Sequence, residues 1–178
     1  MAEVKGKFIT MTGGLMAAYP AKLEEANRVL VNRTGRGWNE LDPEGWYDTS
    51  LFSLFIEAYA ESLPSRDEAI VTLGKKVYPT IKRTAGLPDY LKRPLDFITY
   101  EAEGFLANHR GAGVVPRDFV RIAEKNVIVR APAPGYSAKL FEGVYLGILL
   151  MCGVTSGMVT QTKSTERGDA TDEFDIRW

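Results

Sequence analysis

The side chains of this sequence that could carry chemistry are few, and the most informative is its single histidine. His109 lies in the stretch FLANHRGAG, between an apolar run and two glycines. An imidazole there can ligate a metal or a haem iron, or it can cap the last carbonyls of a helix and complement the helix dipole. The sequence favours a solvated residue at a helix end and keeps haem ligation as the alternative.

Other reactive groups lack the neighbours that catalysis requires. Cys152 is the only cysteine and lies inside an apolar segment, which predicts an inert buried thiol. No serine stands in a G-x-S-x-G context, and the GKK at 74–76 lacks a glycine-rich loop for phosphate. Structural zinc needs about four His or Cys ligands, whereas a carboxylate site for Mg²⁺ or Ca²⁺ stays open. We therefore expect that the protein is not an enzyme.

Composition and charge exclude several classes of function. The chain has 178 residues, of which 45% are hydrophobic, so it can bury the core of one domain spanning residues 1–178. Its 22 basic and 23 acidic residues leave a net charge of -1, which disfavours nucleic acid as a partner. The longest apolar run, 143–154, is shorter than the roughly 20 residues of a membrane span. The N-terminus lacks the pattern of a signal peptide, so we expect a cytoplasmic protein without membrane insertion.

Helical periodicity dominates the first two thirds of the chain. The glycine pair at 13 and 14 interrupts the first helix, Ser65 provides a capping-box start for the fourth, and Pro79 should kink or end that helix. The expected helices span 6–19, 21–33, 49–62, 66–83 and 93–108.

The last third of the sequence changes period. We expect a hairpin over 119–131, a helix over 135–153 that ends at Gly153, and strands over 154–163 and 171–178. In the final strand Phe174, Ile176 and Trp178 alternate with charged residues, which predicts one buried face and one solvated face. The predicted fold class is α+β, with N-terminal helices packed on a C-terminal four-stranded antiparallel sheet and one intervening helix.

The central helices are rich in aromatic side chains. Their helical spacing is first of all typical of a packed core, but in a layered domain the same side chains can also line a pocket between the helices and the sheet. The candidate ligand-binding residues are Phe52, Phe55, Tyr59, Phe97, Tyr100, Phe105, Phe141 and Tyr145.

Four short motifs, in a fixed order, resemble a known superfamily. They are the D-x-x-L-F of WYDTSLFSLF, the L-G-K-K at 73–76, the E-G-x-x-x-G that begins at Glu142, and the terminal F-D-I-x-W. From about residue 46 to 178 the chain resembles haem nitric-oxide/oxygen-binding (H-NOX) domains, four-vinyl-reductase ligand-binding domains and vesicle-tethering transport-particle subunits. The likeness is greatest to a set of uncharacterised myxobacterial paralogues.

The resemblance bears on His109 because haem-binding members carry the axial histidine on a helix before the first hairpin. The P-x-x-F of Pro116 and Phe119 also resembles that family. The family's Tyr-x-Ser-x-Arg clamp for the haem propionates is missing, however. Arg130 is present in VIVRAPAP, but the tyrosine and serine are not, and Tyr136, Ser137 and Lys139 follow with different spacing.

Three functions remain open from the sequence. The leading hypothesis is a non-enzymatic sensory or regulatory domain that binds a small apolar or aromatic molecule. The alternatives are a haem-based gas or redox sensor with His109 as axial ligand, and a ligand-free dimeric adaptor or assembly module. Because the segment 140–152 is apolar nearly all round, either the monomer covers it or a second copy does, and we expect a homodimer that acts on a signalling partner protein.

Overall fold

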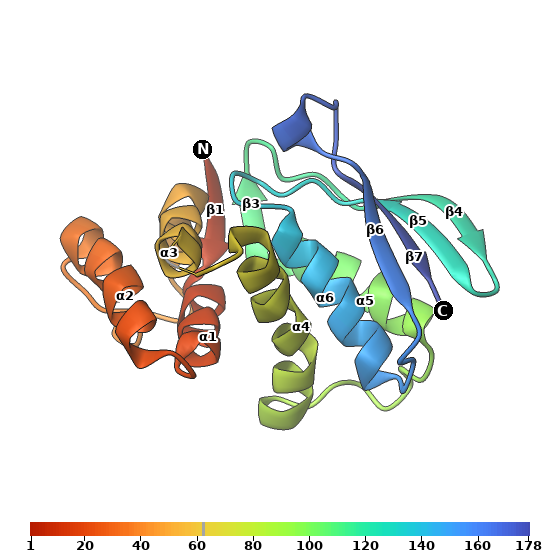
Figure 1. Cartoon of the computed structure of the whole chain (residues 1–178), viewed down its shortest axis with the longest axis horizontal. Coiled ribbons are helices and arrows are strands. Elements are labelled where there is room, and N and C mark those ends of the chain that lie inside the picture. Colours follow the sequence, from red (N-terminus) through yellow and green to blue (C-terminus); the bar gives the residue numbers. More distant parts are fainter. Residues whose placement is uncertain (62) are drawn as a thin grey trace.

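A computed structural model of the chain describes residues 1–61 and 63–178, so Ser62, the last residue of one expected helix, lies outside the description. Helices form the N-terminal side and the centre, and a four-stranded sheet forms the opposite side (Figure 1). The helices are α1 (Gly6–Met16), α2 (Pro20–Thr34), α3 (Thr49–Glu61), α4 (Arg66–Thr84), α5 (Pro94–Asn108) and α6 (Lys139–Met151). The strands are β1 (Ala2–Lys5), β2 (Trp46–Asp48), β3 (His109–Gly111), β4 (Asp118–Ala123), β5 (Asn126–Arg130), β6 (Met158–Lys163) and β7 (Glu173–Arg177).

The four-stranded sheet confirms the predicted α+β plan. Its order is β4-β5-β7-β6, so the two C-terminal hairpins join through the antiparallel pair β5–β7. The final strand also pairs antiparallel with β6, as the sequence predicted. Helix α6 lies between this sheet and α4, which places the intervening helix at the centre of the molecule (Figure 1).

Strand β7 follows the predicted alternation only in its middle. Phe174 and Ile176 are fully buried, whereas Trp178 lies beyond the end of the strand and is only partly buried. Glu173 was expected in solvent but is buried, because Arg130 and Lys163 both pair with its carboxylate at 3.1 Å. A charged side chain can occupy such a position when its charge is compensated.

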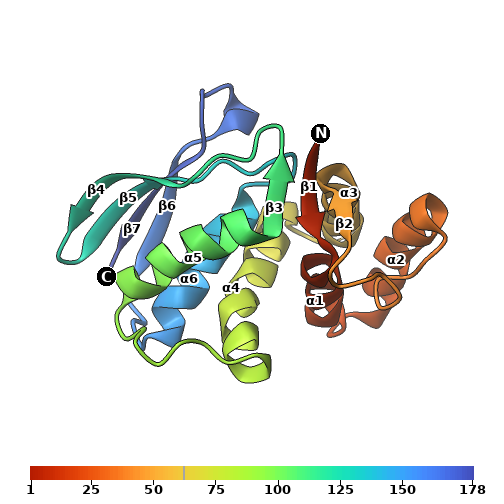
Figure 2. The same ribbon diagram turned by 180° about the vertical axis from the view of Figure 1, so that it is seen from behind.

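The N-terminus forms a second sheet that the sequence did not predict. Strand β1 pairs antiparallel with both β2 and β3, giving the order β2-β1-β3 (Figure 2). Its four residues are too few to establish a period in the sequence. This sheet matters for the site because β3 begins at His109, directly after α5.

Pro79 does not end α4, which continues to Thr84, so of the two predicted effects the end of the helix is wrong and the kink stays a prediction. A proline removes one backbone donor from a helix and frees the carbonyl four residues earlier, here that of Lys75. That carbonyl oxygen lies only 2.4 Å from where a Cβ on Gly147 would stand. The freed carbonyl therefore faces α6 at a point where α6 carries no side chain.

The helices α4 and α6 touch through their backbones. A Cβ on Gly143 would lie 2.2 Å from the carbonyl oxygen of Val71 and 2.8 Å from the Cα of Gly74. Most of α6 is consequently buried inside the monomer, and Leu150 is its exposed large apolar side chain. This apolar helix could be covered by the monomer or by a second copy, and the monomer itself covers nearly all of it.

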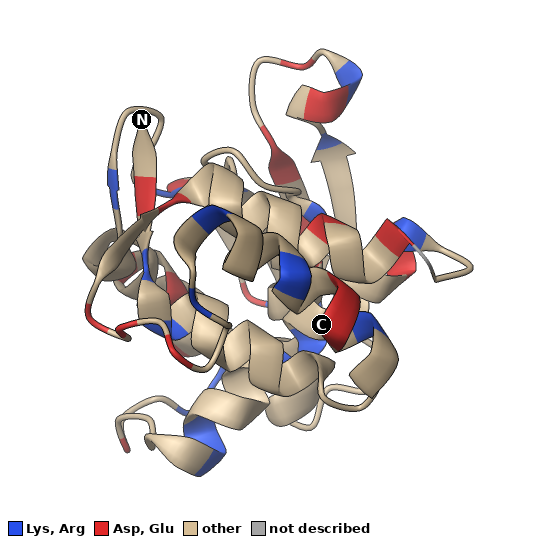
Figure 3. Cartoon of the chain, turned by 90° about the vertical axis from the view of Figure 1, so that its left-hand side faces the viewer, with Lys and Arg blue, Asp and Glu red and all other residues tan. Residues whose placement is uncertain are grey.

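Charged residues of both signs are interspersed over the α2 side of the molecule (Figure 3). This distribution agrees with the nearly neutral composition. Among the helices within residues 1–61 and 63–178, none has the length and apolar character of a membrane span.

Candidate functional site

A cavity of about 380 Å³ lies between α1, α4, α5 and α6. Its volume falls in the range of about 300 to 1,000 Å³ that small-molecule sites occupy. Most of its wall is apolar or aromatic, and five buried side chains bring polar groups to that wall: Thr12, Tyr78, Glu101, His109 and Tyr136. The apolar and aromatic wall includes Phe8, Met11, Phe52, Val77, Tyr78, Ile81, Tyr100, Phe105, Leu140, Phe141 and Val144.

The structure divides the aromatic side chains predicted to bind a ligand into two groups. Those that line the cavity are Phe52, Tyr100, Phe105 and Phe141. The others pack in the core outside the cavity wall, and they are Phe55, Tyr59, Phe97 and Tyr145. The periodicity that placed all eight on apolar helix faces does not tell which part of a wide apolar face meets another helix and which part meets a space.

His109 is not the solvated helix-end residue that the sequence favoured. Its exposed fraction is 4%, and its ring stacks on that of Phe105 with 4.2 Å between centroids. The Nδ1 atom lies 3.0 Å from the carbonyl oxygen of Phe105 in the last turn of α5, so the side chain does satisfy a helix-end carbonyl. The Nε2 atom lies 2.9 Å from the hydroxyl oxygen of Tyr136.

These two contacts fix the protonation state of His109. A carbonyl oxygen only accepts, so Nδ1 must carry a proton and donate to Phe105. Burial, which is the largest effect, and the nearby positive charge of Arg117 together lower the pKa of His109 to about 4, against the opposing effect of the Phe105 carbonyl. The ring is therefore neutral near pH 7, and Nε2 accepts the hydroxyl proton of Tyr136.

A buried ion pair between Arg117 and Glu101 packs against aromatic side chains of the cavity wall. Arg117 donates from one Nη to Glu101 Oε1 at 3.1 Å and from the other to the carbonyl of Pro132 at 3.1 Å. Its Cζ atom lies 3.6 Å from the ring centroid of Phe105 and 4.2 Å from that of Phe141, which are cation–π distances. The Nε of Arg117 has no hydrogen-bond partner among the described residues.

The carboxylate of Glu101 connects this pair to the cavity. Its Oε2 accepts a hydrogen bond from the hydroxyl of Tyr145 at 3.2 Å, and the residue also lines the cavity. Burial alone would lower the pKa of Arg117, but Glu101 and the neighbouring tyrosines raise it overall. Arg117 therefore keeps its charge, and hydrogen bonds hold both partners of the pair.

Reasoning from the sequence missed Glu101 and Arg117. A signal existed for Glu101, because it lies four residues after Phe97 and four before Phe105, on the face of α5 that was read as apolar. A charged residue at such a position needs a buried partner. Arg117 lies in the connection between β3 and β4, where no periodicity marks a residue as buried.

Comparisons with known proteins identify the architecture. No protein-family model and no curated protein matches the chain. Solved structures do match over nearly the whole length. The ferrous unliganded H-NOX protein from K. algicida is 15% identical, with 97% of this chain and 95% of that chain covered and a TM-score of 0.68. The chain has the H-NOX fold.

Two further H-NOX structures show the same agreement. The S. oneidensis protein, in its Fe(II)NO ligation state, is 12% identical, with 97% of this chain and 98% of that chain covered and a TM-score of 0.69. A point variant of the T. tengcongensis protein is 13% identical, with 97% and 95% covered and a TM-score of 0.66. At these identities the likeness establishes the H-NOX fold, and the site must be judged on its own residues.

Haem, which the H-NOX fold implies, does not fit the residues as they are arranged. An axial histidine needs a free lone pair on Nε2, and in His109 that lone pair accepts from Tyr136. The two propionates of haem need cationic or hydrogen-bonding partners, yet Arg117, Arg130 and Lys139 are each paired with acidic residues of this chain, and Lys7, which lines the cavity, is a single exposed cation. In the part of the chain that is described, no three His, Cys, Asp or Glu side chains converge as a metal site either.

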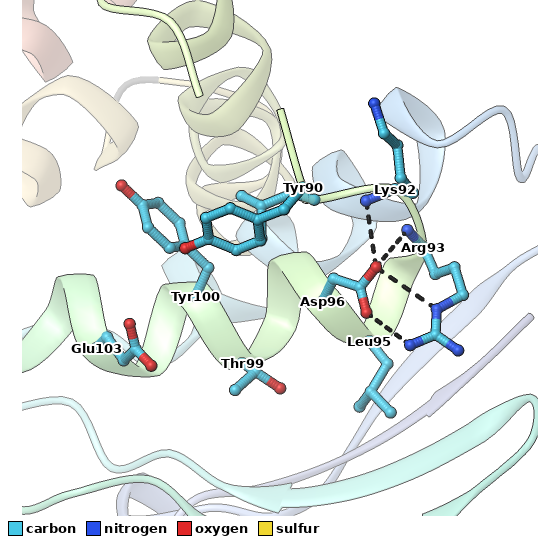
Figure 4. Close-up of a pocket in the computed structure, with 9 residues that line it drawn as sticks. Tyr90, Lys92, Arg93, Leu95, Asp96, Thr99, Tyr100 and Glu103 are labelled. Carbon is cyan, nitrogen blue, oxygen red and sulfur yellow. Dashed lines mark hydrogen bonds and ion pairs between the residues drawn. The ribbon is translucent and has the colours of Figure 1, made fainter. Parts of the chain in front are cut away.

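A second recess, of about 540 Å³, is open to solvent at the start of α5 (Figure 4). Its central carboxylate, Asp96, accepts from the backbone N–H groups of Lys92 and Arg93 and pairs with the Arg93 guanidinium at 2.9 Å. These bonds lower the pKa of Asp96 to about 2. Asp96 thus completes the capping box of α5, and the cavity between the helices remains the candidate site.

Proposed function

We propose that this protein is a non-enzymatic sensory or regulatory domain, residues 1–178, which binds a small apolar or aromatic molecule in the cavity between α1, α4, α5 and α6. The observation that carries the proposal is the cavity itself, with an apolar and aromatic wall and a few buried polar groups. Apolar pockets with a few convergent polar groups are the usual form of small-molecule sites.

The proposal makes the domain independent of haem. The engaged ring nitrogens of His109 support this reading, and so does the pairing of the nearby cations. The H-NOX proteins with the same fold are described with iron, and one with NO bound to it. A haem-based gas or redox sensor is therefore the alternative that the test must separate from the proposal.

The test has two parts. An ultraviolet-visible spectrum of the purified protein is recorded before and after addition of haem, and binding of small aromatic molecules is measured by calorimetry. We expect no stoichiometric Soret band and saturable binding of an aromatic compound, with a protein that melts at higher temperature when the compound is present. Stoichiometric haem uptake that disappears in His109→Ala would favour the alternative and refute the proposal.

The sequence also led to two predictions about partners. The protein is expected to form a homodimer, and a signalling protein is expected to respond to it. Because α6 is nearly all covered by its own chain, a dimer must use other surfaces, and exposed apolar side chains on α2 and α3, Val31 and Leu54, are available for this. Light scattering at micromolar concentration measures the mass directly, and the mass of one chain would contradict the dimer.

A further inference from the structure

The cavity geometry points to a narrower ligand class: we infer that the bound molecule is an aromatic compound that donates a hydrogen bond through an N–H or O–H group. The inference rests on the proposed function, because it assigns the chemistry of the ligand in that same cavity. It follows from a count of the protons and lone pairs that the buried polar groups present. The count begins with the pair of His109 and Tyr136.

The hydroxyl proton of Tyr136 is already in use. Since Nδ1 of His109 donates to the Phe105 carbonyl at 3.0 Å, Nε2 has only a lone pair, and Tyr136 must donate to it across 2.9 Å. The opposite tautomer would set a lone pair of Nδ1 against the carbonyl oxygen and is excluded. The hydroxyl oxygen of Tyr136 therefore offers only lone pairs to a molecule in the cavity.

Glu101 adds acceptors of the same kind. Oε1 accepts from Arg117 and Oε2 accepts from Tyr145, and each carboxylate oxygen has a further lone pair. The charge of Arg117 is compensated by this carboxylate and by the aromatic rings on which it lies. At the Glu101 end of the cavity a ligand carboxylate would thus meet a fixed acceptor, whereas a ligand N–H or O–H would be accepted there.

The other polar groups of the cavity wall do not reverse this preference. The hydroxyls of Thr12, Tyr78 and Tyr100 can rotate and either donate or accept, and Thr84 donates its hydroxyl proton to the Thr80 carbonyl at 2.9 Å. Asn108 donates one amide hydrogen to the Gly104 carbonyl at 2.6 Å, which leaves one N–H as a donor and the amide oxygen as an acceptor, so this side chain favours neither kind of ligand group. Lys7 is exposed, so its ammonium group lies in water and contributes little selectivity within the cavity.

Two probes of nearly the same shape test the inference: indole, which carries a ring N–H, and benzofuran, which has an oxygen at that position. Calorimetry with the full chain near pH 7 gives both dissociation constants. We expect indole to bind about tenfold more tightly, since a ring oxygen that faces buried acceptors leaves them unpaired. Equal affinities, or tighter benzofuran, would overturn the inference and leave the proposed function standing. No binding of either probe would overturn both.

Substitution of His109 provides a second, independent readout. In His109→Leu the Tyr136 hydroxyl loses its acceptor and becomes free to donate to benzofuran. The dissociation constant of benzofuran divided by that of indole should therefore fall by about fivefold. In the matched variant Tyr136→Phe the Nε2 lone pair itself faces the cavity, and the preference for indole should persist. An unchanged ratio in a folded His109→Leu protein, or a lost preference in Tyr136→Phe, would contradict the assigned proton positions.

Discussion

Acidification should destabilise this fold through one side chain, because the chain has a single histidine and it is buried in neutral form. The folded-state pKa of His109, about 4, lies below the ordinary value of 6.5 that applies in the unfolded chain. Above pH 6.5 the imidazole of His109 is neutral in both the folded and the unfolded chain. As the pH falls from 6.5 toward 4, only the unfolded chain takes up the proton, so the free energy of unfolding decreases. Between pH 7 and pH 5 the loss is about 2 kcal/mol.

The measurement is urea unfolding followed by tryptophan fluorescence at several values between pH 7 and pH 5. The matched control is His109→Gln, which removes the titrating group and keeps a polar side chain. Carboxylates affect both proteins alike, so the difference between the two curves isolates the histidine. The wild-type protein should lose about 2 kcal/mol more than the variant over this range. If the free energy of unfolding falls equally with pH in the wild-type protein and the variant, position 109 does not bury a neutral imidazole.

Three further perturbations test the packing. Gly143→Ala should destabilise the protein by about 1 to 3 kcal/mol in chemical denaturation, because the new Cβ meets the α4 backbone. The control Gly14→Ala, where the new Cβ meets open space, should stabilise it by about 0.5 to 1 kcal/mol. Equal effects of the two substitutions would contradict the backbone contact. Glu101→Leu should cost about 3 to 5 kcal/mol by leaving Arg117 unpaired, and adding Arg117→Met should recover much of this loss, which a thermodynamic cycle would measure. Truncation after Asp172 removes the central strand β7 and should abolish cooperative melting in circular dichroism, so a truncated chain that melts sharply would oppose the topology.

Periodicity predicted the elements that have one solvent-exposed face and one buried face. The amphipathic helices α2 to α5 and the alternating strand around Phe174 and Ile176 were recognisable because their side chains repeat at the helical or strand period. Strands β1 to β3 were not, since each has only three or four residues and takes its stability from its neighbours. Pro79 misled for a related reason, because the contact with α6 that accommodates it lies far along the chain.

The site was only partly accessible to the same reasoning. Aromatic content located the right helices, and four of the eight candidates line the cavity. His109 was recognised as the notable residue, but its burial depends on Tyr136 and on β3, which periodicity did not connect to it. The ion pair of Glu101 and Arg117 joins a helix to an irregular connection, and only the folded chain brings them together.

The glycine contact between α4 and α6 also determines how the cavity can change size. Both helices contribute wall residues, among them Val77 from α4 and Val144 from α6. Their backbones meet without intervening side chains, so this wall can neither be compressed nor slide without breaking that contact. The other walls of this cavity of about 380 Å³ are α1 and α5, and β3 follows α5 directly. Under the proposed function, a ligand larger than this space would have to displace α1 or α5, and a displaced α5 would move the small N-terminal sheet with it.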